Sequence, residues 1–78
     1  MKIRVKKYFK NGTLQFCKPQ VRRFFIWFDI LNDVDFVNTI HIKYTRYKLF
    51  YSEAMEVIRE YLVYSDRYVY EISYEDVK

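Results

Sequence analysis

Apolar and polar residues alternate near the start of the chain, and this pattern predicts a β-hairpin. The turn is Asn11-Gly12, which is the preferred pair for a two-residue loop because both of its positions need a positive φ. Strands are expected on either side of it, at residues 2–10 and 13–18. Pro19 follows, and we expect it to end the second strand because proline has no backbone N–H to donate to a neighbouring strand.

A two-residue loop also determines which residues face each other across the hairpin. The expected pairs are Phe9 with Leu14, Lys7 with Phe16 and Val5 with Lys18. The apolar face of the hairpin then comprises Ile3, Val5, Phe9, Leu14 and Phe16. The other face is basic in character and comprises Arg4, Lys6, Tyr8, Lys10, Gln15 and Cys17.

Residues 21–30 are the most apolar stretch and predict a third strand. Phe24 and its alternate positions lie on one face of this strand, and Phe25 and Trp27 lie on the other, so both faces are apolar. Such a strand must be covered on both sides, and the pattern predicts one helix for one of them. We therefore expect a partner molecule to cover the side of Phe25 and Trp27.

The second half of the chain predicts a fourth strand, one helix and a closing strand. After a turn at residues 31–35, apolar and polar positions alternate over residues 36–47. Ser52 is the expected N-cap of an amphipathic helix. Residues 68–75 alternate as a closing strand that carries Glu71 and Glu75 and would pair beside a basic one. The predicted fold is α+β, an antiparallel sheet of four to five strands with one amphipathic helix packed on one face (β-β-β-β-α-β).

Length and composition describe one domain with a surplus of aromatic side chains. A chain of 78 residues has room for one core, so residues 1–78 are assigned to a single domain. Nine Tyr, seven Phe and Trp27 exceed what such a core encloses, and some rings are expected at the surface. Two interpretations stay open: half-buried strands that are rich in tyrosine, or a contact surface.

The charges are distributed unevenly along a chain whose formal net charge is +4. Residues 1–23 contain eight basic residues and no acid, whereas residues 52–78 contain seven acids and three basic residues. Either these ends neutralise each other, within the fold or across a homodimer, or the basic end binds an anionic partner.

The residues that carry chemistry are few, and we expect neither an enzyme nor a metal or cofactor site. Cys17 is the only cysteine, which excludes an intramolecular disulfide and favours the cytoplasm. His41 has no second histidine or cysteine to form a catalytic pair or a zinc site, and one glycine cannot build a phosphate-binding loop. No apolar run is long enough for a membrane span, so no membrane partner is expected.

Basic residues next to aromatic ones are the candidate partner-binding residues. Arginine beside an exposed ring can stack on a base or bind a phosphate with two hydrogen bonds. Two other interpretations apply to the same residues, because lysine on an edge strand prevents aggregation and a second apolar layer can be closed by dimerisation. The predicted partner-binding residues are Arg4, Lys6, Tyr8, Lys10, Arg23, Phe25, Trp27 and Arg46.

The chain also resembles small phage-encoded accessory proteins of the counter-defence kind. The resemblance lies in size, composition and element order: a hairpin, then Phe24-Phe25-Ile26-Trp27-Phe28, then a late helix entered through Phe50-Tyr51-Ser52-Glu53-Ala54-Met55. It implies a stoichiometric inhibitor of a bacterial defence system, as anti-CRISPR proteins and nucleotide sponges are. The implied partners are a host defence protein or nucleoprotein, or an anionic nucleotide ligand. Two alternatives stay open, a single-stranded nucleic-acid or nucleotide-binding module and a structural oligomer.

Overall fold

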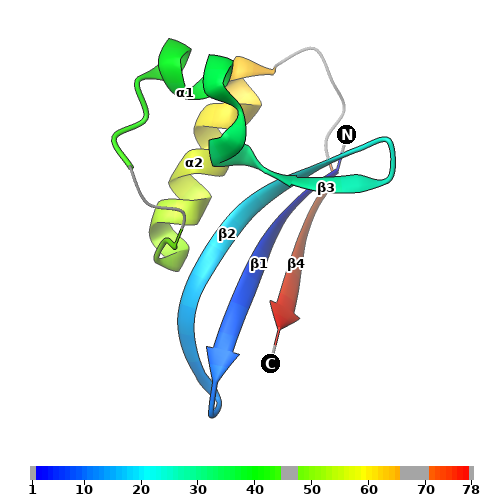
Figure 1. The fold of residues 1–78 in the computed structure, drawn as a ribbon, viewed down its shortest axis with the longest axis vertical. Coiled ribbons are helices and arrows are strands. Elements are labelled where there is room, and N and C mark those ends of the chain that lie inside the picture. Colours follow the sequence, from blue (N-terminus) through cyan, green and yellow to red (C-terminus); the bar gives the residue numbers. More distant parts are fainter. Residues whose placement is uncertain (1, 45–47, 66–70, 78) are drawn as a thin grey trace.

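The computed structural model describes residues 2–44, 48–65 and 71–77, which form one mixed β-sheet and two α-helices (Figure 1). The strands lie in the order β3-β2-β1-β4, and β4 runs parallel to β1 while the other neighbours are antiparallel. The predicted α+β class is confirmed, but the expected all-antiparallel sheet and single helix are wrong. In chain order the elements are β1 (Lys2–Lys10), β2 (Thr13–Arg23), β3 (Ile26–Asp29), the 3-10 turn η1 (Ile30–Asn32), α1 (Val34–Ile40), α2 (Tyr51–Tyr64) and β4 (Glu71–Val77).

The first hairpin turns at Asn11-Gly12 as predicted, with φ values of 52° and 77°. Phe9 pairs with Leu14 as expected, but a bulge then inserts Gln15, so that Tyr8 pairs with Phe16. The expected pairs of Lys7 with Phe16 and of Val5 with Lys18 are therefore wrong. Past the bulge, every side chain of β2 lies on the face opposite to the one predicted, because side chains alternate along a strand.

The bulge follows from the polarity of β2. Beyond it, the apolar residues Cys17 and Val21 alternate with the polar residues Lys18 and Gln20. Only the shifted register buries the apolar set, and Cys17 and Val21 are accordingly in the core.

Pro19 does not end the second strand, because it lies inside β2 and is buried. Cys17 lies two residues before Pro19. It donates a backbone hydrogen bond to Leu49 and accepts one from it, on the side of β2 away from β1. By alternation, the nitrogen of Pro19 faces the same side, between the Leu49 bridge and the start of the β2–β3 pairing at Gln20. No donor is needed at that point, so proline is accommodated.

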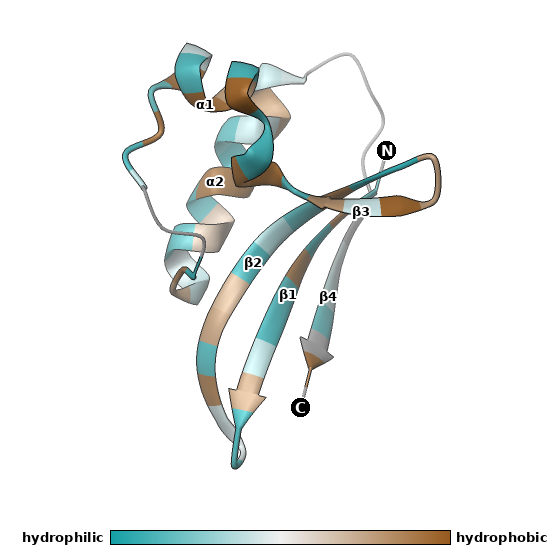
Figure 2. Cartoon of the chain, viewed as in Figure 1, coloured by the Kyte–Doolittle hydropathy of each residue, from teal (hydrophilic) through white to brown (hydrophobic). Residues whose placement is uncertain are grey.

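The predicted strand over residues 21–30 is also wrong, because the chain turns back at Phe24-Phe25. Both residues have a positive φ, 53° and 68°, and the turn joins β2 to β3. Nothing in the local sequence marks a turn, since phenylalanine disfavours this conformation. The turn and the adjoining end of β3 are strongly hydrophobic (Figure 2).

The strand predicted at residues 36–47 is replaced by helix α1. Asp33 caps it by accepting a hydrogen bond from the backbone N–H of Phe36 at 3.2 Å. His41 ends it with a φ of 58°. Residues 45–47, at the end of the predicted strand, lie outside the described residues.

The helix predicted after Ser52 is α2, but its N-cap is Phe50, whose N–H donates to the Glu53 carboxylate at 2.9 Å. α2 packs against β1 and β2, and α1 packs against α2 (Figure 1). The closing strand predicted at residues 68–75 is β4 from Glu71 onward, which pairs with the basic β1, while residues 68–70 of the prediction lie outside the described residues. The core joins one face of the sheet to the helices and comprises Ile3, Val5, Cys17, Val21, Ile30, Phe36, Leu49, Ala54, Val57, Ile58 and Tyr61.

Candidate functional site

The sheet face turned away from α2, here called the open face, combines aromatic and basic side chains. No helix in the described ranges packs on it, since α2 contacts the face that holds the core. Strand alternation and the observed register determine its members. They are Lys2, Arg4, Lys6, Tyr8 and Lys10 of β1, Thr13, Phe16, Lys18, Gln20 and Arg22 of β2, Trp27 and Asp29 of β3, and Ser73, Glu75 and Val77 of β4.

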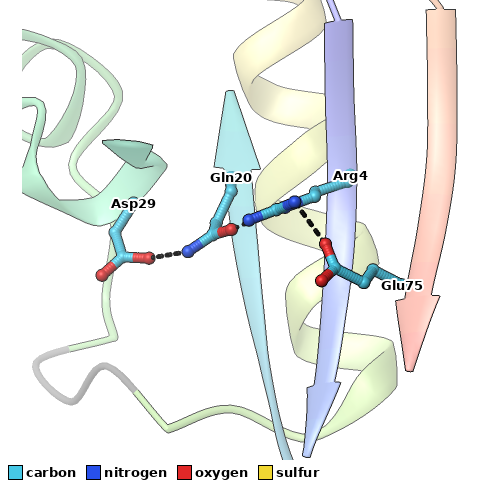
Figure 3. A network of polar contacts seen from close by, with 4 residues as sticks. All are labelled: Arg4, Gln20, Asp29 and Glu75. Carbon is cyan, nitrogen blue, oxygen red and sulfur yellow. Dashed lines mark hydrogen bonds and ion pairs between the residues drawn. The ribbon is translucent and has the colours of Figure 1, made fainter. Parts of the chain in front are cut away.

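A line of polar contacts crosses all four strands of the open face (Figure 3). Gln20 donates from Nε2 to the Asp29 carboxylate at 2.8 Å and accepts from Arg4 Nε at 2.7 Å. Arg4 also forms an ion pair with Glu75. Because the Arg4 side chain is only 13% exposed and its charge is balanced by a carboxylate, it positions its neighbours rather than offering a free cation.

Trp27 is the first aromatic group on the open face. The Arg4 guanidinium lies 4.0 Å from the centre of its ring, in a cation–π contact. Gln20 and Glu75 hold that guanidinium in place. The position of the Trp27 ring is thus determined within the fold, before any ligand binds.

The second aromatic group is the pair Tyr8–Phe16. The rings are stacked, with centroids 4.4 Å apart and planes 18° from parallel. The Nζ atoms of Lys6 and Lys18 lie 5.5 Å and 5.7 Å from the centre of the Tyr8 ring. Both cations therefore approach the same aromatic pair.

Lys6 and Lys18 also lie directly opposite each other in the β1–β2 ladder. Like charges in that position repel and destabilise the sheet. Neither lysine makes an ion pair with a side chain that the structure describes. An anion placed between them would relieve the repulsion, so this pair is the best candidate anion contact on the open face.

Comparison with known proteins gives this chain no relatives. No family model, no curated protein and no solved structure matches it. The resemblance to phage-encoded accessory proteins therefore stays a prediction, and the function has to be inferred from the open face.

The structure places five of the eight predicted partner-binding residues on the open face. Lys10 is the last of them along β1, where it is exposed, whereas Phe25 lies in the β2–β3 turn. Arg46 lies outside the described residues. The predicted residues on the open face are Arg4, Lys6, Tyr8, Lys10 and Trp27.

Arg23 lies on the helix side of the sheet instead. Its Nη2 donates to the hydroxyl of Tyr61 at 2.5 Å and is 3.8 Å from the Asp33 carboxylate. These contacts join the end of β2 to α2 and to the cap of α1. Arg23 thus has a role inside the fold.

Phe16 was expected in the core and is the aromatic residue of the open face that the sequence pattern missed. It faces away from the helices because of the bulge at Gln15, and there it stacks on Tyr8. The signal was the change of phase in β2: Lys18 and Gln20 share the alternation of Phe16, and these polar residues belong on the face away from the apolar core.

Two aspartates in the described part of the chain have structural roles. Asp33 caps α1 and Asp29 accepts from Gln20, so at least these two carboxylates act within the fold. The described residues contain no cluster of three or more His, Cys, Asp or Glu that could hold a metal. None of the described helices is long and apolar enough to cross a membrane.

The Cys17 thiol is expected to be unreactive in the folded protein. Cys17 is completely buried, and burial raises the pKa of its thiol although Lys7 lowers it, so the nucleophilic thiolate is scarce. Reaction with dithionitrobenzoate at pH 8 should be at least about 100-fold slower in buffer than in urea, because the thiol is exposed only on unfolding. Free cysteine under both conditions is the control, and equal rates for the protein would show that Cys17 is accessible.

Proposed function

We propose that this chain is a non-catalytic binding domain that holds single-stranded nucleic acid on its open face. The observation that supports this proposal is the arrangement of two aromatic groups, Trp27 and Tyr8–Phe16, around the pair Lys6 and Lys18. Bases stack on aromatic rings whatever their sequence, and cations between the rings can meet the phosphates that link the bases.

The spacing of these groups suits a short single strand. Arg4, which lies against Trp27, and Tyr8 are four residues apart on β1, or about 13 Å along the strand. Lys6 lies midway between them, opposite Lys18. Four-stranded sheets with surface aromatics commonly stack two or three bases in this way.

A single strand fits this face better than a duplex. Rings bind the flat faces of bases, and in a duplex those faces are stacked inside the helix. The rings here lie on a four-stranded sheet, which is wider than the helix or two-stranded ribbon that a major groove admits. The chain's pI of about 9.2 favours association with a polyanion of either kind, so the rings carry the preference.

The proposal extends to the setting that the resemblance implies, the cytoplasm of a host cell. A phage-type inhibitor would use the open face to occupy the nucleic acid of a defence nucleoprotein, or the site that this nucleic acid needs. Binding of free oligonucleotides is expected if the inhibitor acts on the nucleic acid. An inhibitor that docks on the effector protein itself has no need to bind them.

Intrinsic fluorescence tests the proposal at the site, because Trp27 is the only tryptophan. Titration with oligothymidylate and oligouridylate is expected to quench Trp27 emission as a base stacks on the ring. The affinity should fall steeply with salt, with a log–log slope of about −0.7 for each phosphate contacted. Unchanged emission and an affinity that does not respond to salt would contradict the proposal.

Neutralising the lysine pair should change this salt dependence. We expect Lys6→Gln combined with Lys18→Gln to make the slope shallower by about 1.4, which is the loss of two phosphate contacts. Arg59→Gln is the matched control, because Arg59 is exposed on α2, which packs on the other face of the sheet. A single change of charge there should leave the slope as it is in the unmodified chain.

A further inference from the structure

The two residues of the turn between β2 and β3 are a poor choice for the stability of the fold. Phe24 and Phe25 both adopt the left-handed conformation, and they are 92% and 87% exposed. The other hairpin of the same sheet uses Asn11-Gly12, which accepts a positive φ at little cost. Two exposed phenylalanines in a strained turn gain almost nothing from burial, so a role outside the fold has to be considered.

The two rings of the turn belong to different sides of the sheet. Phe24 lines a cleft of about 400 Å³ on the side of α1, together with Phe28 and Val34. Phe25 lies against Arg22, whose guanidinium is 5.5 Å from the centre of the Phe25 ring. Arg22 is a member of the open face, so Phe25 extends that face beyond its last strand pair.

We propose that Arg22 and Phe25 form a third contact for the bound single strand, next to Trp27. This inference rests on the proposed function. Arg22 pairs directly with Trp27 in the β2–β3 ladder, so the new contact adjoins the first aromatic group. Its chemistry is the same, a ring that can receive a base and a guanidinium that can bind a phosphate with two hydrogen bonds.

The three contacts lie in sequence along the open face. Tyr8–Phe16 is at one end, Trp27 with Arg4 follows, and Arg22 with Phe25 is at the other end. Arg22 pairs with Lys2 of β1, which is six residues from Tyr8. The distance between the two ends, measured along β1, is therefore about 20 Å. A short oligonucleotide occupies the first two contacts, and only a longer one reaches the turn.

A pair of single substitutions in the same turn tests this inference. Phe25→Asn and Phe24→Asn should both preserve the turn, because asparagine tolerates the left-handed conformation better than phenylalanine does. Their melting temperatures should equal or exceed that of the unmodified chain. Binding is then measured through Trp27 emission for oligothymidylates of increasing length.

Phe25→Asn is expected to bind the shortest oligonucleotides as well as the unmodified chain does, and the longer ones about 5- to 150-fold more weakly, which is the loss of one stacked base. Phe24→Asn should match the unmodified chain at every length. Equal affinities for Phe25→Asn at all lengths would overturn the inference and leave the proposed function intact. An equal loss in both variants would overturn it as well, since the turn and not the Phe25 ring would then matter. If the unmodified chain binds no oligonucleotide, the proposed function is wrong, and the inference that rests on it is wrong as well.

Discussion

Tyr61→Ala is expected to lower the free energy of unfolding by about 3–5 kcal/mol, because it removes the largest side chain in the core. The Tyr61 ring makes an edge contact with Phe36, with centroids 5.1 Å apart, and a second contact with Tyr64 at 6.2 Å. Its hydroxyl accepts from Arg23 of β2. One residue thus joins α2, α1 and the sheet. For a chain of this length the total stability is about 4–12 kcal/mol, so the substitution should remove at least about a quarter of it.

Tyr61→Phe is the matched control, because it keeps the ring and removes only the hydroxyl. We expect it to cost no more than about 1.5 kcal/mol, since the partly exposed Arg23 guanidinium can bond to water instead. Urea denaturation followed by circular dichroism measures both variants. If the two variants lost the same stability, the hydrogen bond to Arg23 and not the packing of the ring would be the main contribution of Tyr61.

The features that sequence reasoning predicted are those with a strong local preference. Asn11-Gly12 forms its turn because both residues favour a positive φ, and the next pair, Phe9 with Leu14, follows directly from the turn. α2 follows from the spacing of its apolar residues. In each case one short segment holds all the information that is needed.

The features that it did not predict depend on the rest of the molecule. Phenylalanine is a strand former, so nothing at Phe24-Phe25 announces a reversal of the chain. The parallel partner of β4 depends on the long connection through α1 and α2, which no local pattern specifies. In contrast, α1 had a local signal that was overlooked, the Asp33 cap followed by apolar residues at helical spacing.

The candidate site shows the same division. Arg4, Lys6 and Tyr8 were expected on one face, and they share it because alternation along β1 is regular. Phe16 was assigned to the wrong face, because a bulge changes the alternation of β2 by one residue. That single residue decides whether Tyr8 stands alone on the open face or has an aromatic partner.

The rings of the open face lead to the prediction with the largest effect on binding. We expect the double variant Tyr8→Leu, Trp27→Leu to bind oligothymidylate at least about 30-fold more weakly, because each ring contributes about 1–3 kcal/mol by stacking. Leucine keeps an apolar side chain over the neighbouring strands, so the fold should persist. Since the variant lacks tryptophan, fluorescence anisotropy of a labelled oligonucleotide is the measurement, and circular dichroism verifies the fold.

The salt dependence of the same variant separates stacking from charge. No charged residue is changed, so the log–log slope against salt should equal that of the unmodified chain while the affinity falls at every salt concentration. The lysine variant should behave in the opposite way, with a shallower slope. If removal of the rings left the affinity unchanged, the open face would bind phosphates through its cations alone, and any polyanion, heparin included, should then bind as well as a single strand does. The comparison with heparin therefore decides whether Tyr8 and Trp27 recognise bases or only support the lysines beside them.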